Sequence, residues 1–252
     1  MGKIIAVVNQ KGGVGKTTTA VNLTAALHDL GLKVLLVDFD PQANASSGLG
    51  VDKRCIKHSV YDVIINDLDP VKAIVATKFG DVLPSHSDLA GAGVELLSME
   101  NPNNRLAEAL KKVRDNYDLI LIDCPPSLEL LTLNGLSAAD GILVPVQCEY
   151  YALEGLSDLM STLRAVKRRM NPRLEIFGVA LTMFDGRTNF SNQVAEEVRR
   201  HFPGKVFATV VPRNVRLAEA PSHGLPVTAY DKSSRGAKAY AAMATEVKAK
   251  LN

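Results

Sequence analysis

The sequence predicts one doubly wound α/β domain, with a mostly parallel sheet and helices on both of its faces. Short apolar runs alternate with segments of helical period, which is the pattern of strands joined by crossover helices. A glycine-rich turn joins the first apolar run to the first helical segment. The chain has 252 residues, of which 46% are hydrophobic and 22% are charged, and can bury a large core. We therefore assign residues 1–252 to a single α/β domain.

Five apolar runs are predicted to form buried strands, and three segments of helical period are predicted to form helices. The strands are residues 3–8, 33–38, 118–123, 141–146 and 176–182. The helices are residues 16–31, which end at Gly31, residues 104–117, and residues 154–170, which stop near Pro172. Residues 41–54 are small and polar, and we expect them to form a mobile loop.

The turn after the first strand, "NQKGGVGKTT" at residues 9–18, is nearly a phosphate-binding loop. The strict pattern has glycine where this chain has Gln10, and Lys11 stands beside it as an additional cation. The glycines let backbone N–H groups curl around phosphate oxygens, at the positive end of the following helix. Lys16 would bridge the β and γ phosphates, and the Thr17 hydroxyl would bind Mg²⁺. The predicted nucleotide contacts of the loop are Lys11, Gly12, Gly13, Val14, Gly15, Lys16, Thr17 and Thr18.

Three aspartates follow two other predicted strands, where ligands collect in a sheet of this kind. Asp38 and Asp40 end the second strand in "VDFDPQ", and Asp123 ends the third in "LILIDCPPS". Carboxylates beside a triphosphate repel it unless a metal ion is present. With Mg²⁺, Asp123 would hold the hydrated ion and Asp40 would orient the attacking water. For Asp38 and Asp40 a second interpretation stays open, in which each is a turn carboxylate that caps "PQANA".

Composition narrows the class of protein further. Cys55, Cys124 and Cys148 lie far apart, so neither a disulfide framework nor a zinc site is expected, and we predict that they are small apolar fillers in a reducing compartment. No run approaches a signal-peptide core or a membrane span, so we expect a cytoplasmic protein. The net charge is +2, but residues 127–252 carry 16 basic and 12 acidic side chains against 13 and 15 in residues 1–126. That asymmetry is compatible with a phosphate-binding face and equally with chance.

Five blocks of the sequence resemble the deviant Walker A ATPases and, within them, the ParA-type (Soj-like) chromosome and plasmid partition proteins. The blocks are "KGGVGKTT", "VDFDPQANASSGLG", "LILIDCPPS", "LTMFDGRTNFS" and "VVPRNVRLAEAPSHGLPVTAYDKSSRGAKAY", and they span residues 3 to about 240. The resemblance implies a P-loop fold, ATP and Mg²⁺ as cofactors, and slow ATP hydrolysis that a ParB-type centromere-binding protein stimulates. It also implies an ATP-dependent homodimer that binds double-stranded DNA without sequence preference, in the cytoplasm and on the nucleoid.

The resemblance also assigns roles to single residues. Lys11 would reach the phosphates of the partner subunit, so that two subunits face each other across two ATP molecules; an ordinary solvated loop lysine is the other interpretation. Pro212 and Asn214 in "VPRN" would lie at the adenine base, although the sequence alone also fits a strand end followed by a turn.

Candidate DNA contacts are basic residues, because DNA binding without sequence preference depends on the neutralisation of backbone phosphates. The six candidates are Arg187, Arg213, Arg216, Lys232, Arg235 and Lys238. Each could instead belong to a solvated face. Residues 164–173 are more basic still, but they fall at a predicted helix end where cations suit the helix dipole.

Three other functions remain as alternatives. A MinD-like ATPase would cycle on the membrane through a C-terminal amphipathic helix, but here Tyr240, Met243, Val247 and Leu251 make a narrow stripe among alanines, which favours a helix packed on its own domain. A P-loop ligase would need a further catalytic constellation, and the five histidines are scattered. An iron–sulfur reductase would need cysteines at a dimer axis. No N-terminal helix-turn-helix domain is expected, because the loop begins within a dozen residues of Met1.

Overall fold

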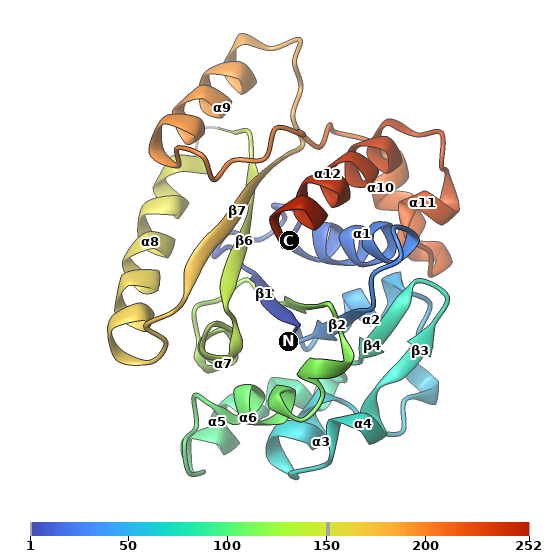
Figure 1. The fold of residues 1–252 in the computed structure, drawn as a ribbon, viewed down its shortest axis with the longest axis vertical. Coiled ribbons are helices and arrows are strands. Elements are labelled where there is room, and N and C mark those ends of the chain that lie inside the picture. Colours follow the sequence, from blue (N-terminus) through green and yellow to red (C-terminus); the bar gives the residue numbers. More distant parts are fainter. Residues whose placement is uncertain (1, 150–151, 252) are drawn as a thin grey trace.

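The computed structural model describes residues 2–149 and 152–251, and for residues 152–157 the backbone alone. In that part of the chain seven strands form one sheet in the order β3-β4-β2-β5-β1-β6-β7 (Figure 1). Neighbouring strands are parallel except for β3, which pairs with β4 in antiparallel register at one edge. The strands are β1 (Lys3–Val7), β2 (Val34–Asp38), β3 (Val75–Thr77), β4 (Gly80–Leu83), β5 (Leu119–Asp123), β6 (Gly141–Gln147) and β7 (Glu175–Thr182).

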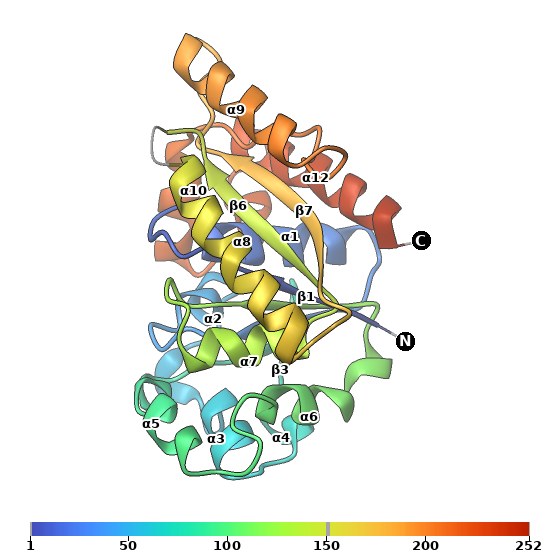
Figure 2. The same ribbon diagram turned by 90° about the vertical axis from the view of Figure 1, so that its left-hand side faces the viewer.

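Helices cover both faces of this sheet (Figures 1 and 2). One face packs against α1 (Lys16–Asp29), α2 (Asn44–Gly48), α10 (Val215–Glu219), α11 (Val227–Tyr230) and α12 (Arg235–Leu251). The other packs against α3 (Val60–Ile65), α4 (Pro70–Ala73), α5 (Ala92–Leu97), α6 (Arg105–Lys111), α7 (Leu130–Ala138), α8 (Ala152–Arg169) and α9 (Asn189–His201). Short 3₁₀ turns are η1 (Lys53–Cys55), η2 (Ser87–Ala90), η3 (Arg114–Asn116) and η4 (Ala220–His223). The predicted doubly wound fold is confirmed.

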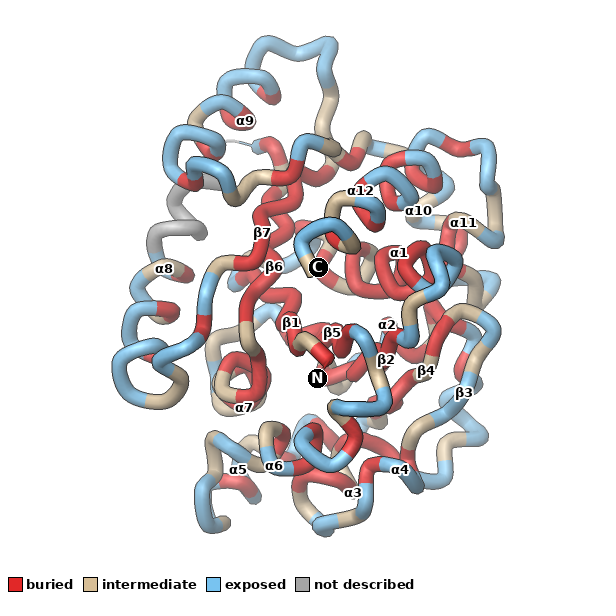
Figure 3. Tube along the Cα trace, in the orientation of Figure 1, coloured by how far each residue is buried: buried red, intermediate tan, exposed pale blue. Residues whose placement is uncertain are grey.

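The inner strand β1 shows why the strands inside the sheet are apolar at nearly every position. Ile4, Ala6 and Val8 belong to the core on the α7 and α8 side, whereas Ile5 and Val7 belong to the core under α1 and α12. Successive side chains point to opposite faces, so a strand covered on both sides needs apolar residues throughout. Figure 3 shows the central strands buried along their length between the two helical layers.

All five predicted strands are present, and all three predicted helices are present with shifted ends; the third, predicted at residues 154–170, is α8 (Ala152–Arg169). The first helix ends at Asp29, and the next predicted helix is shorter, because α6 gives way to the 3₁₀ turn η3. The prediction of a mobile loop at residues 41–54 is wrong. Residues Asn44–Gly48 form α2, and Ala45 and Ser46 are fully buried. The segment is ordered because buried Asp38 accepts hydrogen bonds from the Ser46 amide and hydroxyl, each at 2.7 Å.

The C-terminal helix α12 packs on the domain, as the alanine-rich stripe predicts. Its residues Tyr240, Met243 and Val247 are buried in the core that α1 shares. The hydroxyl of Tyr240 lies 3.0 Å from the Thr19 hydroxyl on α1, so the buried phenol has a hydrogen-bond partner. Within the described residues, no helix combines the length and the apolar character that crossing a bilayer requires.

Candidate nucleotide-binding site

The glycine loop lies at the carboxyl end of β1 and leads directly into α1. Gly13 has φ +74° and Gly15 has φ +91°, backbone conformations that residues other than glycine rarely adopt. Gly15 is also the residue before the first turn of α1, and it has no side chain that could cap that turn. The first amides of the helix therefore point toward the loop, where an anion would receive their hydrogen bonds.

Two residues that sequence reasoning missed fix this loop to the sheet. Asn9 donates from Nδ2 to the Pro145 carbonyl on β6 at 2.7 Å, and its Oδ1 accepts from the Lys11 amide at 3.0 Å. Thr182, the last residue of β7, donates from Oγ1 to the Val14 carbonyl at 2.8 Å. The hydrogen bonds from Asn9 to Pro145 and from Thr182 to Val14 join residues that are far apart in sequence, so no local pattern predicts them. The one available signal was that Asn9 follows a predicted strand and Thr182 ends one.

Lys16 is 7% exposed, and its Nζ donates to the Lys11 carbonyl at 3.1 Å. Burial lowers its pKa, and the nearby carboxylates of Asp123 and Asp40 partly oppose that shift. The ammonium group therefore closes the loop on itself and lies among negative charges. A phosphate group in the loop would compete with the Lys11 carbonyl for this cation.

Asp123 is the most informative side chain of the site. It is fully buried, and within the described residues neither carboxylate oxygen has a hydrogen-bond partner. Burial and the neighbouring Asp38 hold its pKa well above the usual range, and the nearby Thr17 hydroxyl and Lys16 lower that pKa only in part. The Thr17 hydroxyl is therefore close to the carboxylate but outside hydrogen-bond geometry. A buried carboxylate without donors is costly unless a cation meets it. The two orphaned oxygens beside Thr17 therefore fit the ligand set of a hydrated Mg²⁺ ion.

Asp38 and Asp40 differ in their surroundings although they are two residues apart. Asp38 is fully buried and holds α2 through Ser46, and burial raises its pKa to about 6. Asp40 is half-buried, and its Oδ1 accepts from the Gln42 amide at 2.9 Å. Both aspartates thus stabilise the turn after β2, and the Asp40 carboxylate keeps its partial access to solvent beside the loop.

A cavity of about 340 Å³ adjoins the loop between the end of β7 and α12. Gly15 and Thr18 line it on the loop side, and Pro212, Asn214 and Tyr240 line it on the other. Asn214 Oδ1 is buried and has no hydrogen-bond partner among the described residues. Resemblance to the partition ATPases selected Pro212 and Asn214, and both line this cavity beside the loop.

The six basic candidates divide into two groups. Arg187 is paired with Asp185 at 2.7 Å, Arg213 with Glu149 at 3.2 Å, and Arg216 with Glu219 at 2.8 Å and Asp231 at 3.4 Å. Lys232, Arg235 and Lys238 are exposed and form no ion pair in the described part of the chain. If these residues contact DNA, the three paired arginines would exchange a carboxylate for a phosphate. The three unpaired cations would bind a phosphate without losing an ion pair.

The basic cluster at residues 164–173 and the histidines show no sign of a separate binding site in the described part of the chain. Lys167, Arg168 and Arg169 lie in the last turn of α8, where positive charge suits the helix dipole. Among the residues with described placement, no group of three or more His, Cys, Asp or Glu could hold a metal ion. A divalent ion at Asp123 would therefore need Thr17, water and phosphate oxygens to complete its coordination.

Comparison with known proteins finds relatives that match nearly the whole chain. Residues 2–176 match a protein-family model described as an AAA domain. The chain is 56% identical over 251 residues to the sporulation initiation inhibitor protein Soj of Bacillus subtilis, covering 99% of both chains. It is 50% identical over 250 residues to the chromosome partitioning protein ParA of Myxococcus xanthus, covering 98% of this chain and 88% of that protein. The similarity spans the phosphate loop and the later basic segments alike.

A solved structure agrees with the fold. A cobyrinic acid a,c-diamide synthase from Mycobacterium smegmatis, crystallised with ADP and magnesium, superposes with a TM-score of 0.85 at 39% sequence identity. The match covers 97% of this chain and 93% of that one. The two proteins therefore share their architecture across nearly all of both chains.

Proposed function

Because the chain belongs to the ParA-type, Soj-like partition ATPases of the deviant Walker A group, we propose that it is a DNA-segregation ATPase that works as a nucleotide-controlled dimer. In this proposal residues 1–252 form one ATPase domain. ATP and Mg²⁺ bind at the glycine loop, the ATP-bound dimer binds DNA without sequence preference, and a ParB-type protein stimulates hydrolysis. The observation that carries the Mg²⁺–ATP site is the Asp123 carboxylate, which is buried beside Lys16 at the loop without a hydrogen-bond donor. The partition role is supported by the Soj and ParA relatives.

Each residue of the site has a separate task. The loop amides and Lys16 bind the phosphates. Thr17 and Asp123 would hold an Mg²⁺ ion, which would supply positive charge against the phosphate oxygens. Asp40 orients the attacking water, since its carboxylate lies at the loop and keeps access to solvent. When Lys16 turns from the Lys11 carbonyl to phosphate, the loop around Lys11 loses a contact and can present that lysine to the second subunit. ATP binding and dimerisation are thereby coupled.

The structure bears on the alternative functions. A membrane-cycling ATPase needs a C-terminal helix with a free apolar face, and here the apolar residues of α12 are buried against the domain. A ligase is suggested by the name of the Mycobacterium smegmatis structure, which is 39% identical, but the Soj and ParA relatives are 56% and 50% identical to this chain. The iron–sulfur alternative is disfavoured because Cys124 is buried and its thiol pKa is raised, chiefly by burial. We therefore place the protein on DNA rather than on a membrane, in the cytoplasm and associated with the nucleoid.

One experiment separates these functions. Retention of the protein on random double-stranded DNA should be compared with ATP, with ADP and without nucleotide, together with ATP turnover in the presence and absence of that DNA. We expect the protein to be retained on DNA with ATP, but not with ADP or without nucleotide. A ligase or a membrane-cycling ATPase would show no ATP-dependent retention.

Lys16→Ala is expected to weaken ATP binding by about tenfold or more, because it removes the buried cation that bridges the phosphates. Isothermal titration calorimetry with a non-hydrolysable ATP analogue measures the change. Lys33→Ala, an exposed lysine before β2, is a matched control and should leave the affinity unchanged. Equal affinity in Lys16→Ala and the wild type would exclude this loop as the phosphate site.

Arg187→Ala, Arg216→Ala and Lys238→Ala are each expected to weaken DNA binding in the ATP state equally on GC-rich and AT-rich duplexes. Each change should also reduce the slope of log affinity against log salt by about 0.9, since one fewer counterion is released. ATP affinity should stay constant. Slopes unchanged in all three variants would move the DNA surface elsewhere, with residues 164–173 tested next.

The ion pairs of the arginines supply a control for this series. Asp185→Asn removes the carboxylate that holds Arg187, so it should strengthen DNA binding, whereas Arg187→Ala weakens it. Arg54→Ala removes an equally exposed, aspartate-paired arginine outside the proposed DNA surface, and DNA binding should not change. An equal loss in Arg54→Ala would mean that net charge, rather than a local surface, determines affinity.

A further inference from the structure

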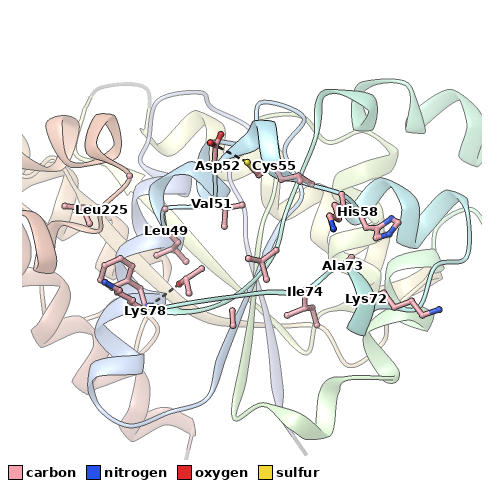
Figure 4. Close-up of a pocket in the computed structure, with 18 residues that line it drawn as sticks. Leu49, Val51, Asp52, Cys55, His58, Lys72, Ala73, Ile74, Lys78 and Leu225 are labelled. Atoms are coloured by element: carbon pink, nitrogen blue, oxygen red, sulfur yellow. Dashed lines mark hydrogen bonds between the residues drawn. The ribbon is translucent and has the colours of Figure 1, made fainter.

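A second cavity lies away from the nucleotide site, along the edge strand β3. It has a volume of about 780 Å³, and neither the glycine loop nor Asp40 or Asp123 lines it. Its walls come from the segment after α2, from the residues around β3 and from Gly224 and Leu225, which follow η4 (Figure 4). The proposed ATPase function leaves this space unused.

The open backbone edge of β3 faces the cavity. All three residues of β3, Val75–Thr77, line it, as do the end of α4 and the turn that follows β3, although successive strand residues point to opposite faces of a sheet. A run of consecutive residues can line one cavity when the cavity follows the strand edge itself. β3 is the last strand of the sheet, and β4 is its one partner strand in the described chain, so alternate N–H and C=O groups face away from β4.

The lining is apolar in the middle and cationic at the margins. Apolar side chains come from Leu49, Val51, Ile56, Ile74, Val75 and Phe79. Lys57, Lys72 and Lys78 also line the cavity, and none of them forms an ion pair in the described part of the chain. Figure 4 shows Lys72 and Lys78 at opposite ends of the cavity. The one lining carboxylate, Asp52, is already bound to Arg54 at 2.9 Å.

We propose that this edge binds an extended acidic segment of a partner protein, which adds a strand beside β3 and places an apolar side chain in the cavity. The backbone groups of β3 supply hydrogen bonds, as in other cases of strand addition. The lysines select carboxylates at both ends of the segment. A second copy of this chain fits less well, because pairing two β3 edges would bring their lysines together.

The test uses a short fluorescent peptide in which glutamate alternates with valine, added to the full-length protein. Fluorescence anisotropy should show saturable binding. Three peptide controls should bind at least about tenfold more weakly: lysine alternating with valine, which reverses the charge; glutamate alternating with proline, which cannot form a strand; and the original peptide with N-methylated valines, which lacks half of its backbone donors. Equal binding of the original peptide and any control would overturn the proposal, as would the absence of binding.

Cys55 reports where the peptide binds. It is exposed and lines the cavity, contrary to the expectation that all three cysteines are buried fillers, whereas Cys124 and Cys148 are buried. A trifluoromethyl tag on Cys55 should therefore label the cavity selectively and shift its ¹⁹F resonance when the glutamate–valine peptide is added. An unshifted resonance at a saturating peptide concentration would overturn the proposal.

A charge-reversed pair of variants completes the test. Lys72→Glu combined with Lys78→Glu should weaken peptide binding by about tenfold or more, while Lys111→Glu combined with Lys112→Glu, an equal charge change on exposed residues near the end of α6, should not. ATP turnover should remain normal in both. A loss of ATP-dependent DNA retention in the first variant, as large as its loss of peptide binding, would overturn the proposal by assigning these lysines to the DNA surface.

Discussion

Lys11→Ala is expected to prevent formation of the ATP-dependent dimer while the monomer still binds ATP. In the proposed dimer each of two composite sites loses one charge-assisted contact, worth roughly 1.5 to 3 kcal/mol. Loss of both would raise the dimer dissociation constant by about two to four orders of magnitude. Light scattering with ATP measures assembly, and calorimetry measures nucleotide binding.

The structure explains why this variant separates the two properties. Lys11 holds the loop through its backbone, because its amide donates to Asn9 Oδ1 and its carbonyl accepts from Lys16 Nζ. Truncation of the side chain leaves both contacts in place. Lys53→Ala, which removes an exposed lysine from η1, is a suitable control and should dimerise normally. Dimers of Lys11→Ala at wild-type concentrations would mean that Lys11 is only a solvated loop residue.

Asp40→Ala is expected to slow ATP hydrolysis by about 10²-fold or more, with ATP-dependent dimers intact or longer lived. The proposed carboxylate positions the attacking water and does not bind ATP, so its loss acts on turnover rather than on affinity. Single-turnover hydrolysis with and without DNA measures the rate, and light scattering measures the lifetime of the dimer.

Asp40→Asn distinguishes catalysis from a structural effect. Asp40 Oδ1 also accepts from the Gln42 amide in the turn, and an asparagine oxygen can keep that hydrogen bond. If the turn alone matters, Asp40→Asn should hydrolyse ATP normally; if the charge matters, it should be as slow as Asp40→Ala. Normal turnover in both variants would move the role to Asp38, the next carboxylate at this end of the sheet.

Local sequence patterns were enough to predict the frame of the molecule and its phosphate loop. Apolar runs and helical periods are patterns among residues that are neighbours in sequence, so they can be recognised without the fold. The glycines are a local signal as well, because glycine readily adopts φ +74° at Gly13 and φ +91° at Gly15. Asp38 and Asp123 were predicted to lie together because both end parallel strands, and they are register partners in adjacent β2 and β5. The roles of Lys11, Pro212 and Asn214 came from family resemblance rather than from any such pattern.

Only the tertiary structure decided how these groups are surrounded. Asn9 and Thr182 anchor the loop to strands that are more than a hundred residues distant in sequence, and the ordered α2 depends on buried Asp38. Whether Arg187 is paired, whether Asp123 lacks a donor and whether β3 has an open edge beside a cavity also depend on which segments meet in space. Periodicity and turn chemistry are set along the chain, but burial, ion pairing and cavities are set by long-range packing, which no single segment encodes.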